Sequence, residues 1–258
     1  MTAFRPMLAH RWQDARPTIR LEAGVYVSPK LDGIRCIITA SGARTRTGEP
    51  IHTIGHILAA LRPLFRTNPG LILDGEIYRH GMAFEEIVSE LSKPNNRRLE
   101  LHVFDVPSHP GRFELRLVEL KRVLGTIRSQ WVKMVPHTLV TSESELEAQL
   151  QAAVADGFEG IMINLAGGLY HNKRSINLLK FKLFRDDEFA IESIGFGTAT
   201  FTTPDGKSFG AQIRGSESRW AELQASESKL IGRLATVRFQ ELTKDGIPRF
   251  ASFVGLRE

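Results

Sequence analysis

Hydrophobic residues in the first part of the chain recur with two spacings, one typical of strands and one of helices. Runs that are mostly apolar, or that alternate apolar with polar residues, predict β-strands. These runs cover residues 24–28, 34–39, 71–78, 99–106, 160–165 and 178–184. Apolar residues at helical spacing predict helices over residues 54–65 and 113–128. A shorter helical stripe consists of Phe84, Ile87, Val88 and Leu91.

A further helix is marked at both of its ends. Ser142 and Glu145 form a capping box, which satisfies backbone N–H groups at a helix start. Gly157 stands where a glycine commonly ends a helix. Because helices and strands are interspersed without strict alternation, we expect an α+β fold and not a doubly wound parallel sheet.

The pattern changes after Arg185, where short strand candidates follow one another. They cover residues 189–195, 209–214, 235–242 and 250–254. Turn signals such as Pro204-Asp205-Gly206 separate them, and residues 217–229 look like a helix or an ordered insert. This arrangement suits a small barrel of the oligonucleotide-binding type. We therefore predict two domains, residues 1–185 and residues 186–258.

Composition narrows the class of protein. The net charge is +5, which fits a polyanionic partner such as nucleic acid, although a mildly basic enzyme without such a partner has the same balance. The single cysteine, Cys36, excludes an intramolecular disulfide and a four-cysteine zinc module. No apolar run is long enough to span a membrane, and residues 1–10 lack a signal-peptide core. We expect an intracellular, cytoplasmic protein.

The most specific motif covers residues 30–35, which read Lys-Leu-Asp-Gly-Ile-Arg. A lysine amine is a nucleophile only when it is neutral, and neighbouring cations lower its pKa. Lys180 and Lys182 are two residues apart in a predicted strand, so their side chains would share one face. They fit a polyphosphate site, but two solvated lysines on an exposed strand give the same pattern.

Carboxylates stand at the edges of two predicted strands, in Leu73-Asp74-Gly75-Glu76 and in Glu159-Gly160. Such residues can bind a divalent metal or ribose hydroxyls, and Mg²⁺ with a nucleotide phosphate fits. Phe104-Asp105 follows another apolar run. A phenylalanine there can stack on a purine or simply belong to the core. Each of these short motifs is weak by itself.

Taken together, the motifs resemble those of ATP-dependent DNA ligases of the minimal kind, in the covalent nucleotidyltransferase superfamily. Residues 30–35 match the nucleotidyl-lysine motif, and Thr45-Arg46-Thr47-Gly48 resembles the second motif. The remaining motifs follow in the family's order, and the resemblance covers nearly the whole chain. It implies an ATP-grasp-like nucleotidyltransferase domain followed by an all-β oligonucleotide-binding (OB-fold) barrel.

The resemblance also implies roles for individual residues. Lys30 would attack the α-phosphate of ATP, Ser28 would lie at the adenine, and Phe104 would stack on it. Glu76 and Glu159 would bind or support Mg²⁺ (or Mn²⁺), and Glu76 could instead bind ribose. The ribose or phosphate oxygens would be held by Arg35, Arg46, Arg174, Lys180 and Lys182. The partner would be nicked double-stranded DNA, sealed between a 3′-hydroxyl and a 5′-phosphate by a monomer.

Some points stay open at the level of sequence. Either Arg249 or Arg257 would orient the pyrophosphate, and Ala251 stands where the family commonly has proline. Only 29 residues precede Lys30, too few for the nicotinamide-binding module of NAD-dependent ligases, so ATP is the expected cofactor. The alternatives are an RNA ligase or RNA guanylyltransferase of the same superfamily, or a non-catalytic nucleic-acid-binding module.

Overall fold

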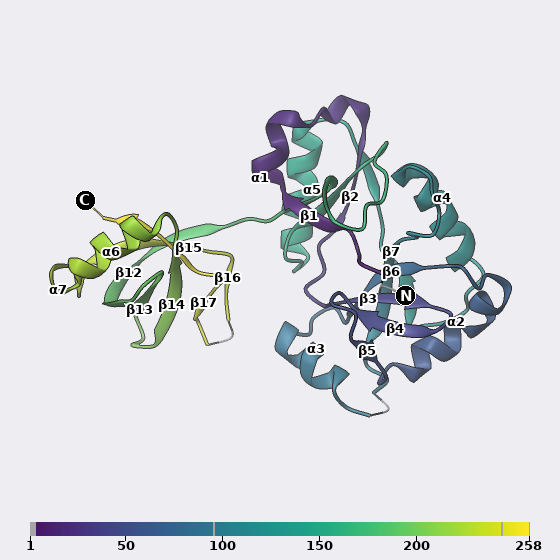
Figure 1. Ribbon diagram of the computed structural model, residues 1–258, viewed down its shortest axis with the longest axis horizontal. Coiled ribbons are helices and arrows are strands. Elements are labelled where there is room, and N and C mark those ends of the chain that lie inside the picture. The colour runs from purple at the N-terminus through teal and green to yellow at the C-terminus, as the bar shows by residue number, and fades with distance from the viewer. Residues whose placement is uncertain (1–3, 95, 244, 258) are drawn as a thin grey trace. The chain divides into compact units, whose positions relative to one another are not determined.

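The computed structural model describes residues 4–94, 96–243 and 245–257. The chain divides into two compact units, residues 1–181 and 182–258 (Figure 1). The sequence places the division slightly later, after Arg185. In the structure Arg185 already begins β12 (Arg185–Ile194), whose residues 185–190 pair with β15 (Leu234–Phe239) of the second unit. The predicted second domain runs to Glu258, which lies outside the described residues.

The first unit contains a six-stranded sheet with the order β5-β4-β3-β6-β7-β8. Its strands are β3 (Ile34–Thr39), β4 (Gly42–Thr45), β5 (Pro50–Ile51), β6 (Leu73–Tyr78), β7 (Glu100–Asp105) and β8 (Val132–Met134). The core of this part combines the sheet with α2 (Gly55–Thr67) and α4 (Phe113–Leu124). Helix α2 buries Ile57, Leu61 and Leu64, the apolar stripe that its sequence predicts.

The first unit also contains a five-stranded sheet with the order β1-β11-β10-β2-β9. Its strands are β1 (Leu8–Arg11), β2 (Val25–Pro29), β9 (Thr138–Val140), β10 (Ile161–Leu165) and β11 (Arg174–Phe181). Helix α5 (Glu143–Ala155) packs on β10 and β2, and the short α1 (Trp12–Ala15) packs on β1 and β11. Two 3-10 turns, Arg16–Thr18 and Leu21–Ala23, lead into β2.

Helix α5 has the ends that the sequence predicts. The Ser142 hydroxyl accepts a hydrogen bond from the Glu145 amide at 3.3 Å. After the helix, Gly157 adopts φ 82°, a left-handed conformation that glycine reaches without a side-chain clash. The Glu145 carboxylate accepts from the Thr141 amide at 2.8 Å and not from Ser142, so the reciprocal half of the predicted capping box is shifted by one residue.

Several of the predicted elements need correction. Val88 is exposed, because α3 (Phe84–Leu91) turns Ile87 and Glu90 inward. Helix α4 ends at Leu124, before the predicted end, and Gly125 follows it. Strand β11 begins earlier than predicted and ends at Phe181, so Lys182 is not on that strand and cannot share a face with Lys180.

The second unit is a closed barrel with the strand order β12-β13-β14-β18-β15. The remaining strands are β13 (Thr198–Thr202), β14 (Ser208–Ile213) and β18 (Ser252–Leu256), with a small hairpin of β16 (Glu241–Leu242) and β17 (Pro248–Arg249). Alternate residues of β14 are buried, and Phe189, Phe201 and Phe253 help to fill the interior. The predicted insert is helical, as α6 (Glu217–Ala225) and α7 (Glu227–Leu230).

The α+β first unit and the C-terminal barrel confirm the predicted fold class. Among the described residues, no helix combines the length and apolar character needed to cross a membrane.

Candidate active site

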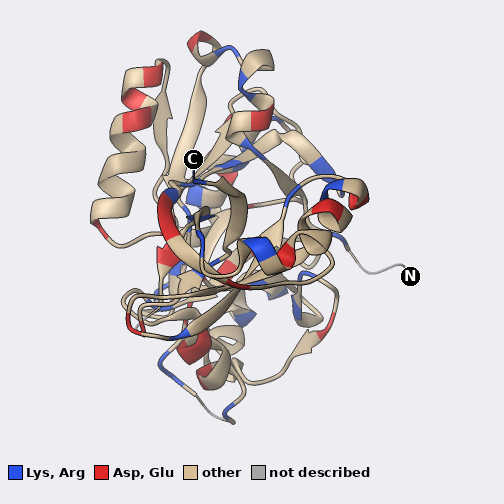
Figure 2. Ribbon diagram, turned by 90° about the vertical axis from the view of Figure 1, so that its left-hand side faces the viewer, with Lys and Arg blue, Asp and Glu red and all other residues tan. Residues whose placement is uncertain are grey.

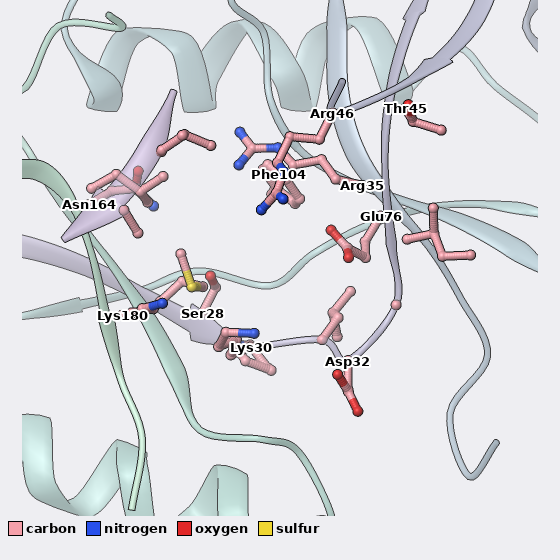
Figure 3. A pocket seen from close by; sticks show the side chains of 18 of the residues that line it. Ser28, Lys30, Asp32, Arg35, Thr45, Arg46, Glu76, Phe104, Asn164 and Lys180 are labelled. Atoms are coloured by element: carbon pink, nitrogen blue, oxygen red, sulfur yellow. The ribbon is translucent and has the colours of Figure 1, made fainter. Parts of the chain in front are cut away.

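One pocket of the first unit, about 520 Å³ in volume, gathers most of the predicted site residues. Pockets of this size suit a nucleotide-sized ligand. Ser28 and Lys180 come from the five-stranded sheet, whereas Arg35, Glu76 and Phe104 come from the six-stranded sheet. In Figure 3, Arg35, Arg46 and Phe104 border one side of the pocket and Ser28, Lys30 and Lys180 the other.

The backbone of Lys30 is held by the two residues that directly precede β10. The Lys30 amide donates to the Gly160 carbonyl at 2.8 Å, and the Glu159 amide donates to the Lys30 carbonyl at 3.3 Å. Gly33 approaches β6 so closely that a Cβ there would lie 2.4 Å from the Ile77 carbonyl oxygen. Only glycine permits this approach, which brings the loop carrying Lys30 against the strand that carries Glu76.

The Lys30 ammonium lies in a largely buried, acidic setting. Its Nζ forms an ion pair with Glu159, whose side chain is 3% exposed. Burial lowers the pKa of Lys30, and the carboxylates of Glu76 and Asp32 act in the opposite direction. The amine is therefore easier to deprotonate than a surface lysine, while a carboxylate lies in contact with the proton that must leave.

Glu76 faces the same pocket from β6. Burial raises the pKa of Glu76 to about 7, although the positive charges of Arg35 and Lys30 act to lower it. Asp74 and Asp32 raise it further by repulsion. A carboxyl poised near neutral pH becomes a full carboxylate when a cation or a donor approaches, which suits a ligand for a divalent metal or a ribose hydroxyl.

Arg35 is held rigidly at the pocket wall. Its Nε and Nη2 donate to the two oxygens of Asp74 at 2.8 and 2.6 Å, and Asp74 is completely buried. The guanidinium carbon lies 5.3 Å from the centre of the Phe104 ring. The Asp74 carboxylate raises the pKa of Arg35, so this residue stays charged. A second buried pair lies beside it, because Arg116 binds Asp105 at 2.7 Å and Asp105 is the cross-strand neighbour of Asp74.

Lys180, on β11, interacts with positive charges from several parts of the first unit. Lys180 has its pKa lowered first by burial and then by the positive charges of Lys30, Arg11, Arg174 and Arg46. Arg174 also donates to the Ala9 carbonyl. Because mutual repulsion among these cations is relieved when an anion binds, the pocket beside Lys180 suits phosphate oxygens.

The predicted residues fall into three groups. Eight of them line the pocket: Ser28, Lys30, Arg35, Arg46, Glu76, Phe104, Arg174 and Lys180. Glu159 reaches the site through its ion pair with Lys30. Lys182 belongs to the second unit, where its Nζ donates to Gln240 at 2.8 Å and lies 5.4 Å from the Phe250 ring centre.

Each arginine left open for the pyrophosphate role makes an ion pair within the second unit. Arg249 contacts Glu241, and Arg257 contacts Glu188.

Three polar residues around the pocket have contacts or positions that the sequence did not predict. Asn164 lines it and is 6% exposed, and its side-chain amide makes no hydrogen bond with any described residue. It lies two residues after Met162 on the same face of β10, and Met162 also lines the pocket. Asp74 was part of a quoted motif, but no feature of the sequence pairs it with Arg35. Tyr170, which donates to Asp74, gave no local signal at all.

Comparison with known sequences agrees with this geometry. A sequence model described as the ATP dependent DNA ligase domain matches residues 6–182, and one described as a DNA ligase OB-like domain matches residues 196–257. The chain belongs to the ATP-dependent DNA ligase family. It is therefore an enzyme of the class that the motifs predict, with a nucleotidyltransferase domain and an OB-like barrel.

Individual relatives cover most of this ligase chain. A DNA ligase of Haemophilus influenzae is 26% identical over 236 residues, which is 89% of this chain and 85% of the relative. A DNA ligase of Archaeoglobus fulgidus is 27% identical over 198 residues, 69% of this chain but 35% of that protein.

Solved structures show the same fold. One, from a study of DNA binding by the minimal scaffold of Lig E DNA ligases, aligns with a TM-score of 0.83 and 26% identity over 98% of this chain and 99% of its own. The Chlorella virus DNA ligase-adenylate aligns with a TM-score of 0.60 and 23% identity, covering 100% of this chain and 99% of its own.

Proposed function

We propose that this ligase seals nicks in duplex DNA by joining a 3′-hydroxyl to a 5′-phosphate through an AMP group carried on Lys30. The observation that supports this best is the position of Lys30. Its side chain lines a pocket large enough for a nucleotide, contacts the Glu159 carboxylate, and lies close enough to Lys180 for the two positive charges to repel each other. A lysine that only contributed to stability would gain nothing from this arrangement.

In the first step the Lys30 Nζ attacks the α-phosphorus of ATP. The N–P bond forms, the bond from that phosphorus to the bridging oxygen breaks, and pyrophosphate leaves. Burial eases loss of the ammonium proton, and Glu159 is the carboxylate in contact to receive it. Arg35, Arg46 and Lys180 stabilise charge on the phosphate oxygens, so positioning and electrostatics supply most of the rate.

The donor set suits Mg²⁺ or Mn²⁺ bound together with a triphosphate. Glu76 would hold the ion and Glu159 would support it from beside Lys30, since Mg²⁺ commonly takes one or two protein carboxylates and completes its shell with phosphate and water oxygens. When bound, the ion would neutralise charge on the phosphates. Phe104 would stack on the adenine, with Ser28 at its edge, so that the base fixes the α-phosphate near Lys30.

The later steps transfer the AMP to a 5′-phosphate at the nick, and the neighbouring 3′-hydroxyl then displaces it. Lys and Arg residues occur in strands, helices and loops of the chain (Figure 2), and the net charge is +5. Contacts to the DNA backbone are therefore expected to be ionic, and binding of nicked DNA should weaken steeply and log-linearly as salt rises. We expect the active form to be a monomer in the cytoplasm.

The test is mass spectrometry of the protein after incubation with ATP and Mg²⁺, followed by peptide mapping. The wild type and the Lys121→Ala control, which changes an exposed lysine on α4, should carry one AMP, on Lys30. Lys30→Ala should carry none and should not join nicked DNA. An adduct elsewhere, or ligation by Lys30→Ala, would refute the assigned nucleophile.

Adduct formation, nick joining and DNA binding together distinguish the alternatives that the sequence left open. An adduct formed from GTP but not from ATP would indicate a guanylyltransferase. Joining of nicked RNA in preference to nicked DNA would indicate an RNA ligase. Binding of nicked DNA without any lysine adduct would indicate a non-catalytic module.

A further inference from the structure

The buried carboxylate of Asp74 receives three hydrogen bonds, and one of them comes from a residue outside the nucleotide pocket. Arg35 supplies two, from Nε at 2.8 Å and from Nη2 at 2.6 Å. The third is donated by the Tyr170 hydroxyl to Asp74 Oδ2, also at 2.6 Å. Asp74 Oδ2 is therefore shared between a guanidinium that faces the pocket and a phenol that does not.

Tyr170 is itself held from several sides. Its ring stacks on Phe4 with the centroids 6.0 Å apart, and the Arg116 guanidinium carbon lies 5.6 Å from the ring centre. The Met7 amide donates to the Tyr170 hydroxyl at 2.9 Å. Burial raises the pKa of Tyr170 and the Asp74 carboxylate raises it further, so the phenol keeps its proton and remains a donor.

The hydroxyl joins two parts of the first unit that belong to different sheets. Tyr170 lies in the segment between β10 and β11 of the five-stranded sheet, four residues before Arg174, which lines the pocket. Asp74 and Arg35 lie on β6 and β3 of the six-stranded sheet. The same hydrogen bond therefore influences both the position of one pocket wall and the orientation of a cation in the other.

A carboxylate that binds only the two parallel N–H groups of one arginine can still rotate about its own side-chain bonds. A third hydrogen bond to one of its oxygens removes that freedom. In the same way, a hydrogen bond to a metal-binding side chain fixes the orientation of that side chain. Buried polar networks of this kind are rigid only when every member is satisfied.

We propose that Tyr170 is a positioning residue for the nucleotide site, because its hydroxyl locks the Asp74 carboxylate and thereby fixes the Arg35 guanidinium where it meets the bound nucleotide. This role rests on the proposed function, in which Arg35 holds ribose or phosphate oxygens. Tyr170 itself does not line the pocket.

The direct test is Tyr170→Phe, which keeps the ring and its packing and removes only the oxygen. The matched control is Tyr26→Phe. The Tyr26 ring packs against Phe113 in the same unit, and its hydroxyl makes no hydrogen bond with any described residue. We expect kcat/KM for lysyl-AMP formation to fall about tenfold in Tyr170→Phe, the loss of about one good hydrogen bond to a charged group. Tyr26→Phe should stay within about twofold of wild type.

A second pair of variants separates positioning from a merely structural effect. In an Arg35→Lys background the paired N–H donors of the guanidinium are absent, while a positive charge opposite Asp74 remains. Removing the Tyr170 hydroxyl from that variant should therefore lower kcat/KM by less than about twofold. If Tyr170→Phe costs the same tenfold in that background, the hydroxyl acts through Met7 or through general stability, and the proposal is overturned. A wild-type value of kcat/KM in Tyr170→Phe alone would also overturn it.

The role of Tyr170 can also be tested without the chemical step. Calorimetry in EDTA measures ATP binding when no divalent ion is available for lysyl-AMP formation. The affinity should fall in Tyr170→Phe and not in Tyr26→Phe, with circular dichroism confirming that both variants are folded. If the wild type binds ATP but never forms an adduct, the proposed function fails while this comparison still decides the role of Tyr170. Equal ATP affinity in wild type and Tyr170→Phe would count against the role of Tyr170 alone.

Discussion

Replacing Glu76 by glutamine should stabilise the protein at alkaline pH and at the same time inactivate it. Glu76 lies in the pocket wall, where burial raises its pKa from 4.5 to about 7 despite the nearby Arg35 and Lys30. Glutamine has nearly the same shape and resembles the protonated acid. The substitution therefore removes the cost of ionising this side chain inside the folded protein.

The direction follows from proton linkage. Between pH 4.5 and 7 the folded protein holds the Glu76 proton more tightly than the unfolded chain does. The free energy of unfolding contributed by this group therefore falls as the pH rises through that range. The gap between the two pKa values corresponds to about 3 kcal/mol at pH 8. Because the pocket admits water, screening reduces the expected gain in Glu76→Gln to about 2 kcal/mol.

The assay is urea unfolding followed by tryptophan fluorescence at pH 5, 6, 7 and 8. Trp12 and Trp131 lie in the first unit and Trp220 in the second, so a Trp220→Phe background makes the signal report the first unit only. Glu147→Gln, at an exposed position on α5, is the matched control. Glu76→Gln should match wild type at pH 5 within about 1 kcal/mol and gain stability steadily up to pH 8.

A gain that does not depend on pH, or no gain at pH 8, would show that Glu76 is not held in a costly ionised state. Lysyl-AMP formation measured on the same samples should be nearly abolished, because the variant cannot bind a metal ion or accept from ribose as a carboxylate. Full activity in Glu76→Gln would refute that role.

Three further predictions concern other residues of the first unit. Phe104→Ala should weaken ATP binding about tenfold through lost stacking and change binding of nicked DNA little, whereas equal losses in both assays would indicate a packing role. Gly33→Ala should slow adduct formation about a hundredfold, because its Cβ would displace the loop carrying Lys30, while Gly55→Ala, which meets no neighbouring atom, should not. Burial lowers the pKa of His137 from 6.5 to about 4, so the unfolded chain takes up this proton first as the pH falls. Between pH 7 and 5 wild type should therefore lose about 2 kcal/mol more unfolding free energy than His137→Gln, and parallel curves would contradict this.

The sequence predicts those parts of the fold in which local chemistry and tertiary packing agree. Helix α2 carries a long apolar stripe, and α5 is marked by Ser142 and Gly157, so both could be located. Strands such as β5 and β8 have two or three residues, too few to display any period. Their pairing depends on neighbours that are distant in the sequence.

The candidate site was predicted from residue types in motifs. This succeeded where the alternation of side chains along one strand is enough to place a residue in the pocket. Lys180 is one such residue, since β11 carries it into the pocket. For Lys182 the prediction fails, because β11 ends at Phe181 and the alternation of side chains between the two faces of the strand does not extend to Lys182. Tyr170 and Asp74 are 96 positions apart, and only the folded arrangement of the two sheets brings them together.

The two buried ion pairs, Arg35 with Asp74 and Arg116 with Asp105, limit how this enzyme can change over evolution. Loss of one member leaves its partner charged inside the protein, at a cost of about 3–5 kcal/mol, comparable to much of the stability of a small domain. Single substitutions at these four positions should therefore be eliminated, and homologues that differ there should differ at both members of a pair. Randomised libraries should vary each arginine jointly with its aspartate, since independent variation would yield mostly chains that do not fold.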